Sequence, residues 1–429
     1  MGKNKNKNIK PIRSCRLCGG KHLLDILSLG EQGLSDFIDI SDKSSVSKYP
    51  LELILCTGCS LLQLKHTTPP QKLYTERYGY RSGINQTMRD ELSSITKQAE
   101  SLISLKKGDI VLDIGCNDGT LLAEYKTPDI IRVGFDPVPS FVIHFEKALN
   151  PFGVKNYKLF NDFFSKEPFL KEFKGKKAKI ITAISMFYDL DDPNTFVSDI
   201  KSCLDKNGLL VIQQNYLVGM LKQNAFDNIV HEHLEYYSLT SLENLLKKYH
   251  LEIFDVSESS INGGSFRTFI KHEGSRLGTE AGRIRVEQMR KKERSLNLTS
   301  PATYHDFAKR VKDITKKLYD FIKKEARKGK VVYIYGASTR GNTLLQACKL
   351  NSTLIKAAAE RNSDKWGKKI ASLGIPIISE EEARSNRPDF FLVLPWFFRE
   401  EFLKREKAFL KRGGGMIFPL PKFEVVKLS

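Results

Sequence analysis

The stretch Val111–Leu122, with the sequence VLDIGCNDGTLL, constrains the fold of this chain more than any other. An apolar run leads to Asp113, the glycines Gly115 and Gly119 follow closely, and Thr120 then begins a second apolar run. Glycine permits the left-handed backbone of a tight turn, and the free N–H groups at the start of a helix face whatever lies over it. The stretch therefore predicts a strand, a turn and a helix N-terminus, with a ligand over the turn.

Acidic residues indicate which ligand suits this turn. A dinucleotide fingerprint reads G-x-G-x-x-G and faces a pyrophosphate, whereas Asp113 and Asp118 would repel that group and favour an ammonium or sulfonium. The next predicted strand, Ile131–Phe135, is followed by Asp136, whose carboxylate can accept both ribose hydroxyls. On these residues the stretch resembles the class I S-adenosylmethionine-dependent methyltransferases. The alternative is an ordinary Rossmann-type turn with solvated acids.

Strand and helix patterns alternate beyond the turn, which predicts a mostly parallel sheet covered on both faces. The last two predicted strands, Leu251–Val256 and Ser265–Lys271, have so short a connection that we expect an antiparallel pair. Ligands of such sheets bind beyond the carboxyl ends of the strands. Phe163 is there a candidate for stacking on adenine, with a place in the core as its alternative. The residues expected to hold the methyl donor all follow strands: Asp113, Gly115, Cys116, Asn117, Asp136, Asp162, Phe163 and Ser185.

Four of the 7 cysteines form two C-x-x-C pairs, Cys15 with Cys18 and Cys56 with Cys59. Two such knuckles can place four thiolates tetrahedrally around Zn²⁺. Disulfides are the alternative, but the other cysteines show no paired spacing, and in a cytoplasmic protein, as we expect here, thiols stay reduced. We expect a structural zinc site, with no open coordination position, in a small domain over residues 14–72 whose short core the metal stabilises.

The hydropathy and the charge of the sequence bear on whether the chain binds a membrane or a nucleic acid. No run of about 18 apolar residues occurs, so we expect no membrane partner, and the lysine- and asparagine-rich residues 1–13 are expected to form a disordered basic tail and not a secretory signal. Much of the net charge of +19 lies in that tail and in a helical stretch from about Arg276 to Lys330. No nucleic-acid recognition module with interleaved aromatic residues accompanies these charges, so we expect solvated helix faces, no nucleic-acid partner, and a monomer or homodimer.

The loop Tyr74–Arg89 is crowded with Tyr, Arg, Ser and Asn and shows little periodicity. It predicts a lid or entrance loop that offers Tyr78, Tyr80 and Ser82 to a polar substrate. The alternative is that the tyrosine rings pack against the core while their hydroxyls are exposed to water.

The segment Asn224–Ser238, NAFDNIVHEHLEYYS, places two histidines around a glutamate. An imidazole near its natural pKa can remove a proton, and a neighbouring carboxylate can fix its tautomer. His231, Glu232 and His233 are therefore candidates for acid–base work. A metal site is the weaker interpretation, because no third ligand follows with zinc-type spacing. A structural role for one of the two histidines stays open.

A second strand, glycine turn and helix N-terminus occurs near the end of the chain. Lys330–Tyr335 is typical of a parallel strand, and the turn GASTRGNT at residues 336–343 carries Ser, Thr and Arg in place of acids. Backbone N–H groups, hydroxyls and a guanidinium suit phosphate. The expected substrate-binding residues are those of this turn, one asparagine just after a predicted strand and one in the connection between the last two strands: Ser338, Thr339, Arg340, Asn342, Asn215 and Asn262.

In the order of its motifs, the chain resembles the sugar C-methyltransferase family, whose members methylate nucleotide-linked keto-deoxysugars. The resemblance covers nearly all of the chain and rests on both knuckles, the tyrosine-rich loop, VLDIGCNDGTLL, HEHLEYYS, GGSFR at 263–267, GASTRGNTLLQ at 336–346 and LPW at 394–396. It implies an α/β protein: a class I methyltransferase Rossmann-like domain over 73–273, flanked by the zinc-binding domain and, over 274–429, by a helical segment and a Rossmann-like substrate-binding domain.

The resemblance also implies site residues. His233 matches the family's general base beside Glu232, and Tyr78 or Tyr80 matches a tyrosine on the substrate side. Two positions depart from the family: Val230 stands where members carry a tyrosine, and Asp189 stands where they carry a histidine.

We therefore expect S-adenosylmethionine-dependent methyl transfer to a nucleotide-linked (deoxy)sugar, at a carbon beside a ketone. The alternative is O- or N-methylation of another glycan or small-molecule precursor, and a non-catalytic nucleic-acid-binding module is a more distant one.

Overall fold

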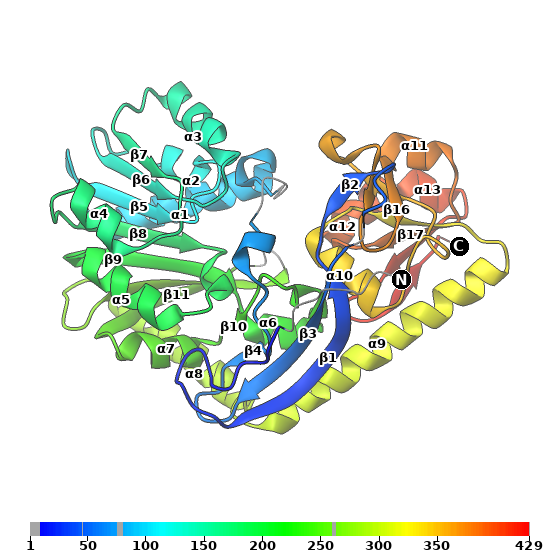
Figure 1. Cartoon of the computed structure of the whole chain (residues 1–429), viewed down its shortest axis with the longest axis horizontal. Helices are drawn as coiled ribbons and strands as arrows, with labels where there is room; N and C mark the ends of the chain where they lie inside the picture. The colour runs from blue at the N-terminus through cyan, green and yellow to red at the C-terminus, as the bar shows by residue number, and fades with distance from the viewer. Residues whose placement is uncertain (1–8, 45, 75–79, 260–262, 429) are drawn as a thin grey trace.

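The structure is a computed structural model that describes residues 9–44, 46–74, 80–259 and 263–428. Two α/β lobes lie side by side, and the N-terminal strands cross between them (Figure 1). The strand orders confirm the expected α/β class, with a Rossmann-like sheet in each lobe.

The central sheet has the strand order β11-β12-β9-β8-β5-β6-β7. Five strands run parallel, and β12 is antiparallel to both β9 and β11, as the short connection predicted. The strands are β5 (Ile110–Ile114), β6 (Ile131–Phe135), β7 (Tyr157–Phe160), β8 (Ala178–Ile184), β9 (Leu204–Asn215), β11 (Leu251–Ser259) and β12 (Ser265–His272).

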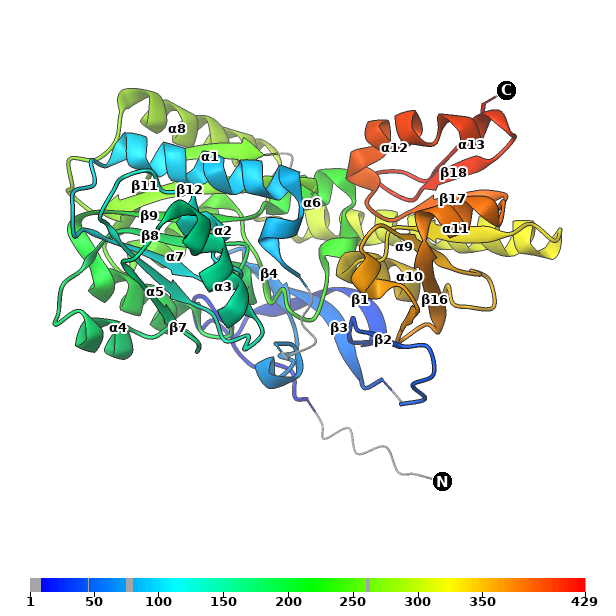
Figure 2. The ribbon, with the colours of Figure 1, turned by 90° about the horizontal axis from the view of Figure 1, so that it is seen from above.

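Successive side chains of β5 point to opposite faces, so Val111 joins one buried cluster while Ile110 and Leu112 join the other. Each face is covered by helices (Figure 2). One cluster contains residues of α1 (Gln86–Leu102), α2 (Thr120–Ala123) and α3 (Phe141–Leu149). The other contains residues of α4 (Lys166–Glu172), α5 (Pro193–Cys203) and α7 (Leu239–Lys247).

The N-terminal sheet is completed by a strand from the histidine-containing segment. Its order is β1-β3-β4-β10, where β1 is Leu23–Gly33, β3 is Lys48–Cys56, β4 is Leu62–Leu64 and β10 is Glu235–Tyr236. Strand β10 pairs antiparallel with β4, and the N–H of Leu64 also donates to the Leu234 carbonyl at 2.8 Å. The metal-binding region and the histidine segment therefore share one sheet.

The C-terminal sheet also recruits a distant strand. Its order is β19-β18-β17-β13-β14-β16-β15-β2, and β2 (Phe37–Asp39) comes from the N-terminal region. The other strands are β13 (Val332–Tyr335), β14 (Ala358–Glu360), β15 (Lys368–Ile370), β16 (Ile375–Ser379), β17 (Phe390–Val393), β18 (Gly415–Phe418) and β19 (Glu424–Val426). Its helices are α10 (Thr339–Ala347), α11 (Glu380–Ser385), α12 (Arg399–Arg405) and α13 (Lys407–Lys411).

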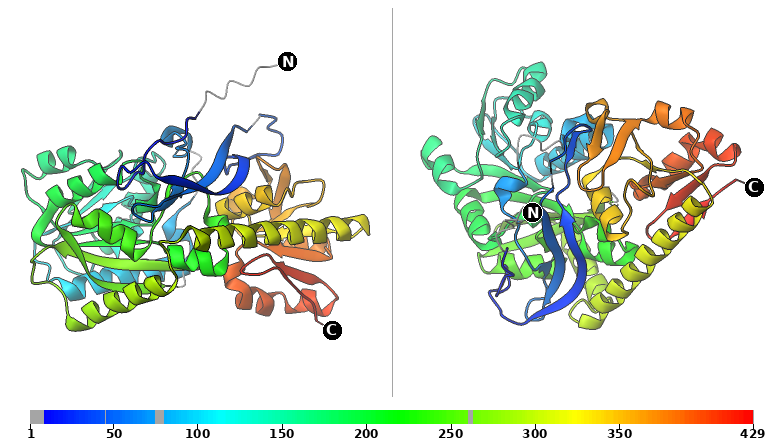
Figure 3. Two further views of the ribbon diagram at one scale, coloured as in Figure 1. Left: turned by 90° about the horizontal axis from the view of Figure 1, so that it is seen from below. Right: turned by 45° about the vertical axis from the view of Figure 1, so that its right-hand side comes forward.

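The remaining described α-helices are α6 (Leu217–Gln223), α8 (Glu280–Ser295), which packs on β11 and α7, and α9 (Pro301–Arg327). Buried residues recur every three or four positions along α9, which gives it one apolar face. That helix runs from the lobe that contains the central sheet along the C-terminal lobe, and it packs against β1 (Figure 3). Among the described residues, no helix has the length and apolar character needed to cross a membrane.

Candidate functional site

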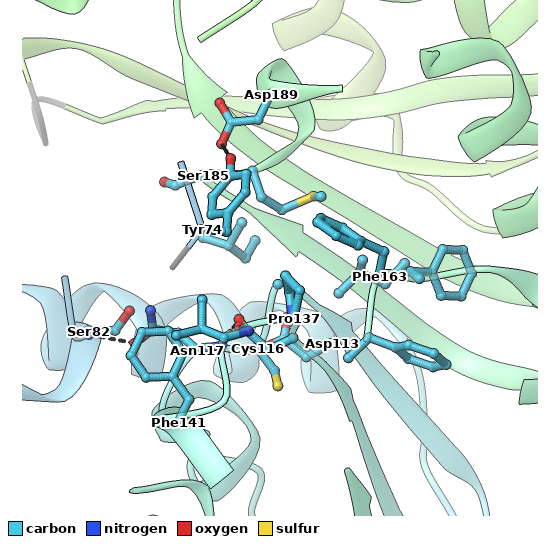
Figure 4. A pocket seen from close by; sticks show the side chains of 18 of the residues that line it. Tyr74, Ser82, Asp113, Cys116, Asn117, Pro137, Phe141, Phe163, Ser185 and Asp189 are labelled. Carbon is cyan, nitrogen blue, oxygen red and sulfur yellow. Dashed lines mark hydrogen bonds between the residues drawn. The ribbon is translucent and has the colours of Figure 1, made fainter. Parts of the chain in front are cut away.

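A cavity of about 270 Å³ lies at the carboxyl ends of β5, β6 and β8 (Figure 4). Parallel strands present the residues that follow them at one edge of a sheet, which explains why these side chains meet. The cavity is lined by every residue that the sequence assigned to the methyl donor: Asp113, Gly115, Cys116, Asn117, Asp136, Asp162, Phe163 and Ser185. Phe163 is 50% exposed at this cavity, so its ring is not a core residue.

The glycine turn leaves no space for a side chain at Gly115. Its φ is 72°, and an added Cβ would lie 2.9 Å from Cγ of Met186. Asp136 is fixed by the same turn, because Oδ2 accepts the Asn117 N–H at 2.9 Å and Oδ1 accepts the Val138 N–H at 3.0 Å. The acid that we expect to hold the ribose therefore has a set orientation.

Asp113 is 3% exposed and accepts the hydroxyl of Thr182 at 2.5 Å. Burial raises the pKa of Asp113 to about 7, and the nearby Asp136 carboxylate adds to that rise. Asp118, which the sequence placed with Asp113 as an acid for a cationic ligand, is instead occupied by protein groups. It accepts the hydroxyl of Thr120 at 2.7 Å and the N–H of Gly83 at 2.9 Å.

The tyrosine-rich loop is held directly on the glycine turn. Asn117 Oδ1 accepts the Ser82 N–H at 3.0 Å, and its Nδ2 donates to the Tyr80 carbonyl at 3.0 Å. Tyr80 and Ser82 line the cavity, and Tyr80 is 48% exposed. Tyr78 lies outside the described residues. The described end of the loop therefore covers the expected binding site of the methyl donor.

At the other end of the cavity, the hydroxyl of Tyr74 donates to Oδ2 of Asp189 at 2.9 Å (Figure 4). Burial raises the pKa of Asp189, and the charge of Glu232 raises it further. Tyr74 was not among the residues that the sequence predicted for the site, although it belongs to the tyrosine-rich loop, whose composition was the available signal.

His233 has one ring nitrogen occupied. Its Nδ1 donates to the Asn228 carbonyl at 2.8 Å, so Nε2 carries the lone pair, and Nε2 makes no hydrogen bond within the described residues. The ring lies edge-on to Tyr188, with centroids 4.4 Å apart, and Tyr188 directly precedes Asp189 of the cavity. Burial lowers the pKa of His233 to about 4. The sequence predicted that Glu232 orients this imidazole, but the structure gives that role to a backbone carbonyl.

His231 points away from the cavity toward the N-terminal sheet. It is 5% exposed, its Nε2 lies 3.2 Å from the carbonyl oxygen of Tyr49, and its ring lies edge-on to the Tyr49 ring. Burial lowers its pKa to about 4. We interpret His231 as the structural member of the pair, a role that the sequence left open.

The second glycine turn already has several protein partners. Ser338 caps α10 by accepting the Gly341 N–H at 3.1 Å, and Arg340 pairs with Asp227 at 2.8 Å. Asn342 is 1% exposed, and its Oδ1 accepts the Ser372 hydroxyl at 2.8 Å, so its side chain is not open to a substrate in this conformation.

The remaining substrate candidates are spread apart. Thr339 uses its carbonyl to accept the Ser35 hydroxyl at 3.2 Å. Asn215 ends β9 and is not among the described residues that line the cavity, and Asn262 lies outside the described residues.

The two cysteine knuckles meet in space. The sulfur of Cys15 lies 3.6 Å from that of Cys59, and the sulfur of Cys18 lies 3.6 Å from that of Cys56. All four sulfurs lie within 4.8 Å of one another, and all four residues are free cysteines. A disulfide would need about 2 Å between sulfurs, whereas tetrahedral Zn–S bonds of about 2.3 Å set them nearly 4 Å apart. The four thiolates fit a structural zinc ion.

Comparison with known families matches three consecutive regions of the chain. Residues 15–74 match a zinc binding domain, residues 81–256 match a methyltransferase domain, and residues 260–421 match a C-methyltransferase C-terminal domain. The C-methyltransferase NovU of Streptomyces niveus is 29% identical over 420 residues, which cover 97% of this chain and 98% of that protein.

Solved structures align with part of the chain. Magnesium protoporphyrin IX methyltransferase (ChlM) from Synechocystis PCC 6803 with bound SAH is 14% identical, with a TM-score of 0.36, over 47% of this chain and 92% of that chain. N-methyltransferase NodS from Bradyrhizobium japonicum WM9 is 13% identical, with a TM-score of 0.34, over 44% of this chain and 98% of that chain.

Proposed function

We propose that this chain, as an S-adenosylmethionine-dependent C-methyltransferase with an N-terminal zinc-binding domain, methylates a nucleotide-linked sugar beside a ketone, with His233 as general base. The observation that carries the assignment of the base is the hydrogen bond from His233 Nδ1 to the Asn228 carbonyl. It leaves Nε2 as a proton acceptor, and the lowered pKa keeps the ring neutral at pH 7.

The residues that line the cavity would bind the donor, and His233, which lies against Tyr188 beside the cavity and does not line it, would act as the base. Asp136, Asp162 and Phe163 hold the ribose and adenine of S-adenosylmethionine, and the turn at Gly115 receives its methionine part. When bound, S-adenosylmethionine supplies an electrophilic methyl group to the deprotonated acceptor carbon. His233 Nε2 takes the proton from that carbon, whose acidity the adjacent ketone raises. The lid residues Tyr80 and Ser82 exclude water from the donor end.

The charge and position of Arg340 favour binding of the acceptor's nucleotide near the second glycine turn. Its charge contributes to the lowered pKa of His233, so the guanidinium lies within electrostatic reach of the proposed base. An Arg–phosphate contact is strong and directional. We place the diphosphate of the acceptor near Arg340 and Thr339, with its sugar toward His233. The nucleotide-linked class itself is what the family resemblance implies.

The test is mass spectrometry of the products after incubation with S-adenosylmethionine and a panel of nucleotide-linked sugars, with and without a keto group. We expect one added methyl group on a keto-sugar and exchange of the adjacent C–H in deuterated water. In a His233→Asn variant, turnover is expected to fall about 10²- to 10⁴-fold, while S-adenosylmethionine binding by calorimetry stays unchanged. Methyl transfer to oxygen or nitrogen without that exchange would replace the C-methylation proposal with the alternative reaction.

A further inference from the structure

Asp189 has one carboxyl oxygen occupied and one without a partner. It ends the 3-10 helix η4 (Phe187–Asp189) after β8, and its Oδ2 accepts the Tyr74 hydroxyl at 2.9 Å. Its Oδ1 is buried and makes no hydrogen bond within residues 9–44, 46–74, 80–259 and 263–428. In Figure 4 both side chains lie at the end of the cavity away from Asn117 and Cys116. Asp189 lines the cavity, so an acceptor bound at that end lies beside a carboxyl group that has one unsatisfied oxygen.

The cavity has an excess of acidic side chains. The described residues that line the cavity include no lysine, arginine or histidine, and they include Asp113, Asp136, Asp162, Asp189 and Asp191. Asp113 and Asp136 belong to the expected binding site of the methyl donor. Asp191 is compensated, because Oδ1 lies 3.0 Å from the Arg16 guanidinium and accepts the Thr67 hydroxyl at 2.7 Å. Asp189 makes no ion pair among the described residues.

Two residues near Asp189 add further polar groups to this acidic end of the cavity. Glu232 lies close enough for its charge to raise the pKa of Asp189. Tyr236 is 4% exposed, and its hydroxyl makes no hydrogen bond within the described part of the chain. The charges of Asp189 and Glu232 both raise the pKa of that hydroxyl, so it lies within electrostatic reach of both. A buried polar group without a partner is costly, and such groups in a binding site indicate a ligand.

The chemistry of the missing partner follows from these groups. A phosphate or carboxylate would be repelled by these acids. A ketone oxygen could only accept a hydrogen bond from the protonated form of Asp189, which would leave the other acids of the cavity uncompensated. A hydroxyl could donate one hydrogen bond but would leave the negative charge uncompensated. An ammonium donates up to three hydrogen bonds and brings the opposite charge, which also favours the ionised form of Asp189.

We propose that the acceptor carries an amino group and that Asp189, held by Tyr74, binds its ammonium form through Oδ1. The proposal rests on the proposed function and narrows its substrate class to amino sugars. An ammonium nitrogen has no lone pair, so the group held by Asp189 does not take the methyl group itself. Asp189 thus selects the acceptor while the methyl group goes to carbon.

The test uses two nucleotide-linked keto-sugars that differ only by an amino or a hydroxyl group at one carbon. Hydrogen bonds between charged partners change affinity by about 10- to 100-fold, so we expect the wild type to prefer the amino sugar by that factor in kcat/KM. In Asp189→Asn, whose amide oxygen still accepts the Tyr74 hydroxyl, the preference should fall below about threefold, mainly through KM. A Tyr74→Phe variant should show a partial loss.

Asp191→Asn is the matched control, because Asp191 lines the same cavity but already has Arg16 as its partner. It should keep the amino preference. Equal use of both sugars by the wild type would overturn the inference and leave the proposed function standing. A loss of S-adenosylmethionine binding in Asp189→Asn, with the preference intact, would also overturn it, by assigning Asp189 to the ammonium of the donor. Failure to methylate any nucleotide-linked sugar would overturn both proposals.

Discussion

The carbonyl oxygen of Asn228 lies 2.8 Å from Nδ1 of His233 and holds the imidazole with Nε2 as its acceptor. Burial keeps that ring unprotonated, with a pKa of about 4, because the apolar surroundings disfavour the imidazolium. A backbone carbonyl cannot be altered by substitution at its own position, so this arrangement persists when nearby side chains change.

His233 should titrate far below an ordinary histidine. We expect its ring nitrogens to show the neutral Nδ1–H form by NMR above pH 5 and to protonate near pH 4. As pH falls through that value, kcat/KM should fall, because protonation removes the acceptor lone pair. The spectrum of His233→Asn identifies the resonance. A titration midpoint near 6.5 would contradict the assignment.

His231 should make folding stability depend on pH. Its pKa is about 4 when folded and 6.5 as an ordinary histidine, so the unfolded chain binds more protons between these values. Its contribution is complete above pH 6.5 and is lost as pH falls toward 4, by about 3 kcal/mol in total. The unfolding free energy of wild type minus that of His231→Gln, measured by denaturant at several pH values, isolates this effect. A difference that stays constant over this range would contradict it.

Asn117 should couple the tyrosine-rich loop to donor binding. Its side chain makes two hydrogen bonds to the backbone of Ser82 and Tyr80, and Asn117→Ala removes both. We expect S-adenosylmethionine affinity to fall about 30-fold by calorimetry, because two hydrogen bonds at about 1 kcal/mol each are lost. Asn85→Ala is the control, because it removes the N-cap of α1 and costs about 1 kcal/mol of stability. If Asn85→Ala weakened donor binding equally, the loop would not be specifically responsible.

The strands at the cavity were predictable from the sequence because local patterns specify them. The bounds of β5 and β6 match the apolar runs, and Asp113 and Asp136 lie at their carboxyl ends, where the topology of a parallel sheet gathers them. The metal site that contains Cys15 and Cys59 was predictable for a related reason. Each C-x-x-C pair forms a local turn, and the site requires only that the two turns come together in the fold.

Pairings between distant segments left no such signal. Strand β10 has two residues, too few to show a period, and its partner β4 lies far away in sequence. The pairing of β2 with β15 likewise links the two ends of the chain. The partner of His233 is a backbone carbonyl, which any residue could supply, so the sequence favoured the side chain of Glu232 instead. Local periodicity predicts elements, but it does not specify which distant edges pair.

Zinc removal should disturb the histidine segment more than the donor site. Strand β4 begins shortly after Cys59 and pairs with β10, which follows His233 by two residues. Chelation removes a large share of the folding free energy of such a small domain, so we expect faster hydrogen exchange over residues 230–237 and loss of turnover. S-adenosylmethionine affinity should stay within about threefold, because Asp113 and Asp136 lie on the other sheet. Cys203→Ser, at a buried cysteine of α5, is the control for general thiol effects, and unchanged exchange over 230–237 would contradict the link.

Arg340 and Asp227 should tie the C-terminal lobe to the histidine segment. Asp227 is 1% exposed and accepts Arg340 at 2.8 Å and the Trp396 indole N–H at 3.1 Å. Asp227→Ala leaves a largely buried guanidinium without this carboxylate, so we expect a loss of about 3–5 kcal/mol by denaturant unfolding.

The partner variant Arg340→Gln gives a second readout. Since the Arg340 charge lowers the pKa of His233, its removal should raise that pKa, but to less than 6.5, because burial is the larger cause. Arg399→Gln, at the more exposed pair with Glu424, should cost about 0–1 kcal/mol and leave His233 unchanged. A His233 titration identical in Arg340→Gln and wild type would show that the second glycine turn does not influence the base. The C-terminal lobe would then act on the reaction only through substrate binding.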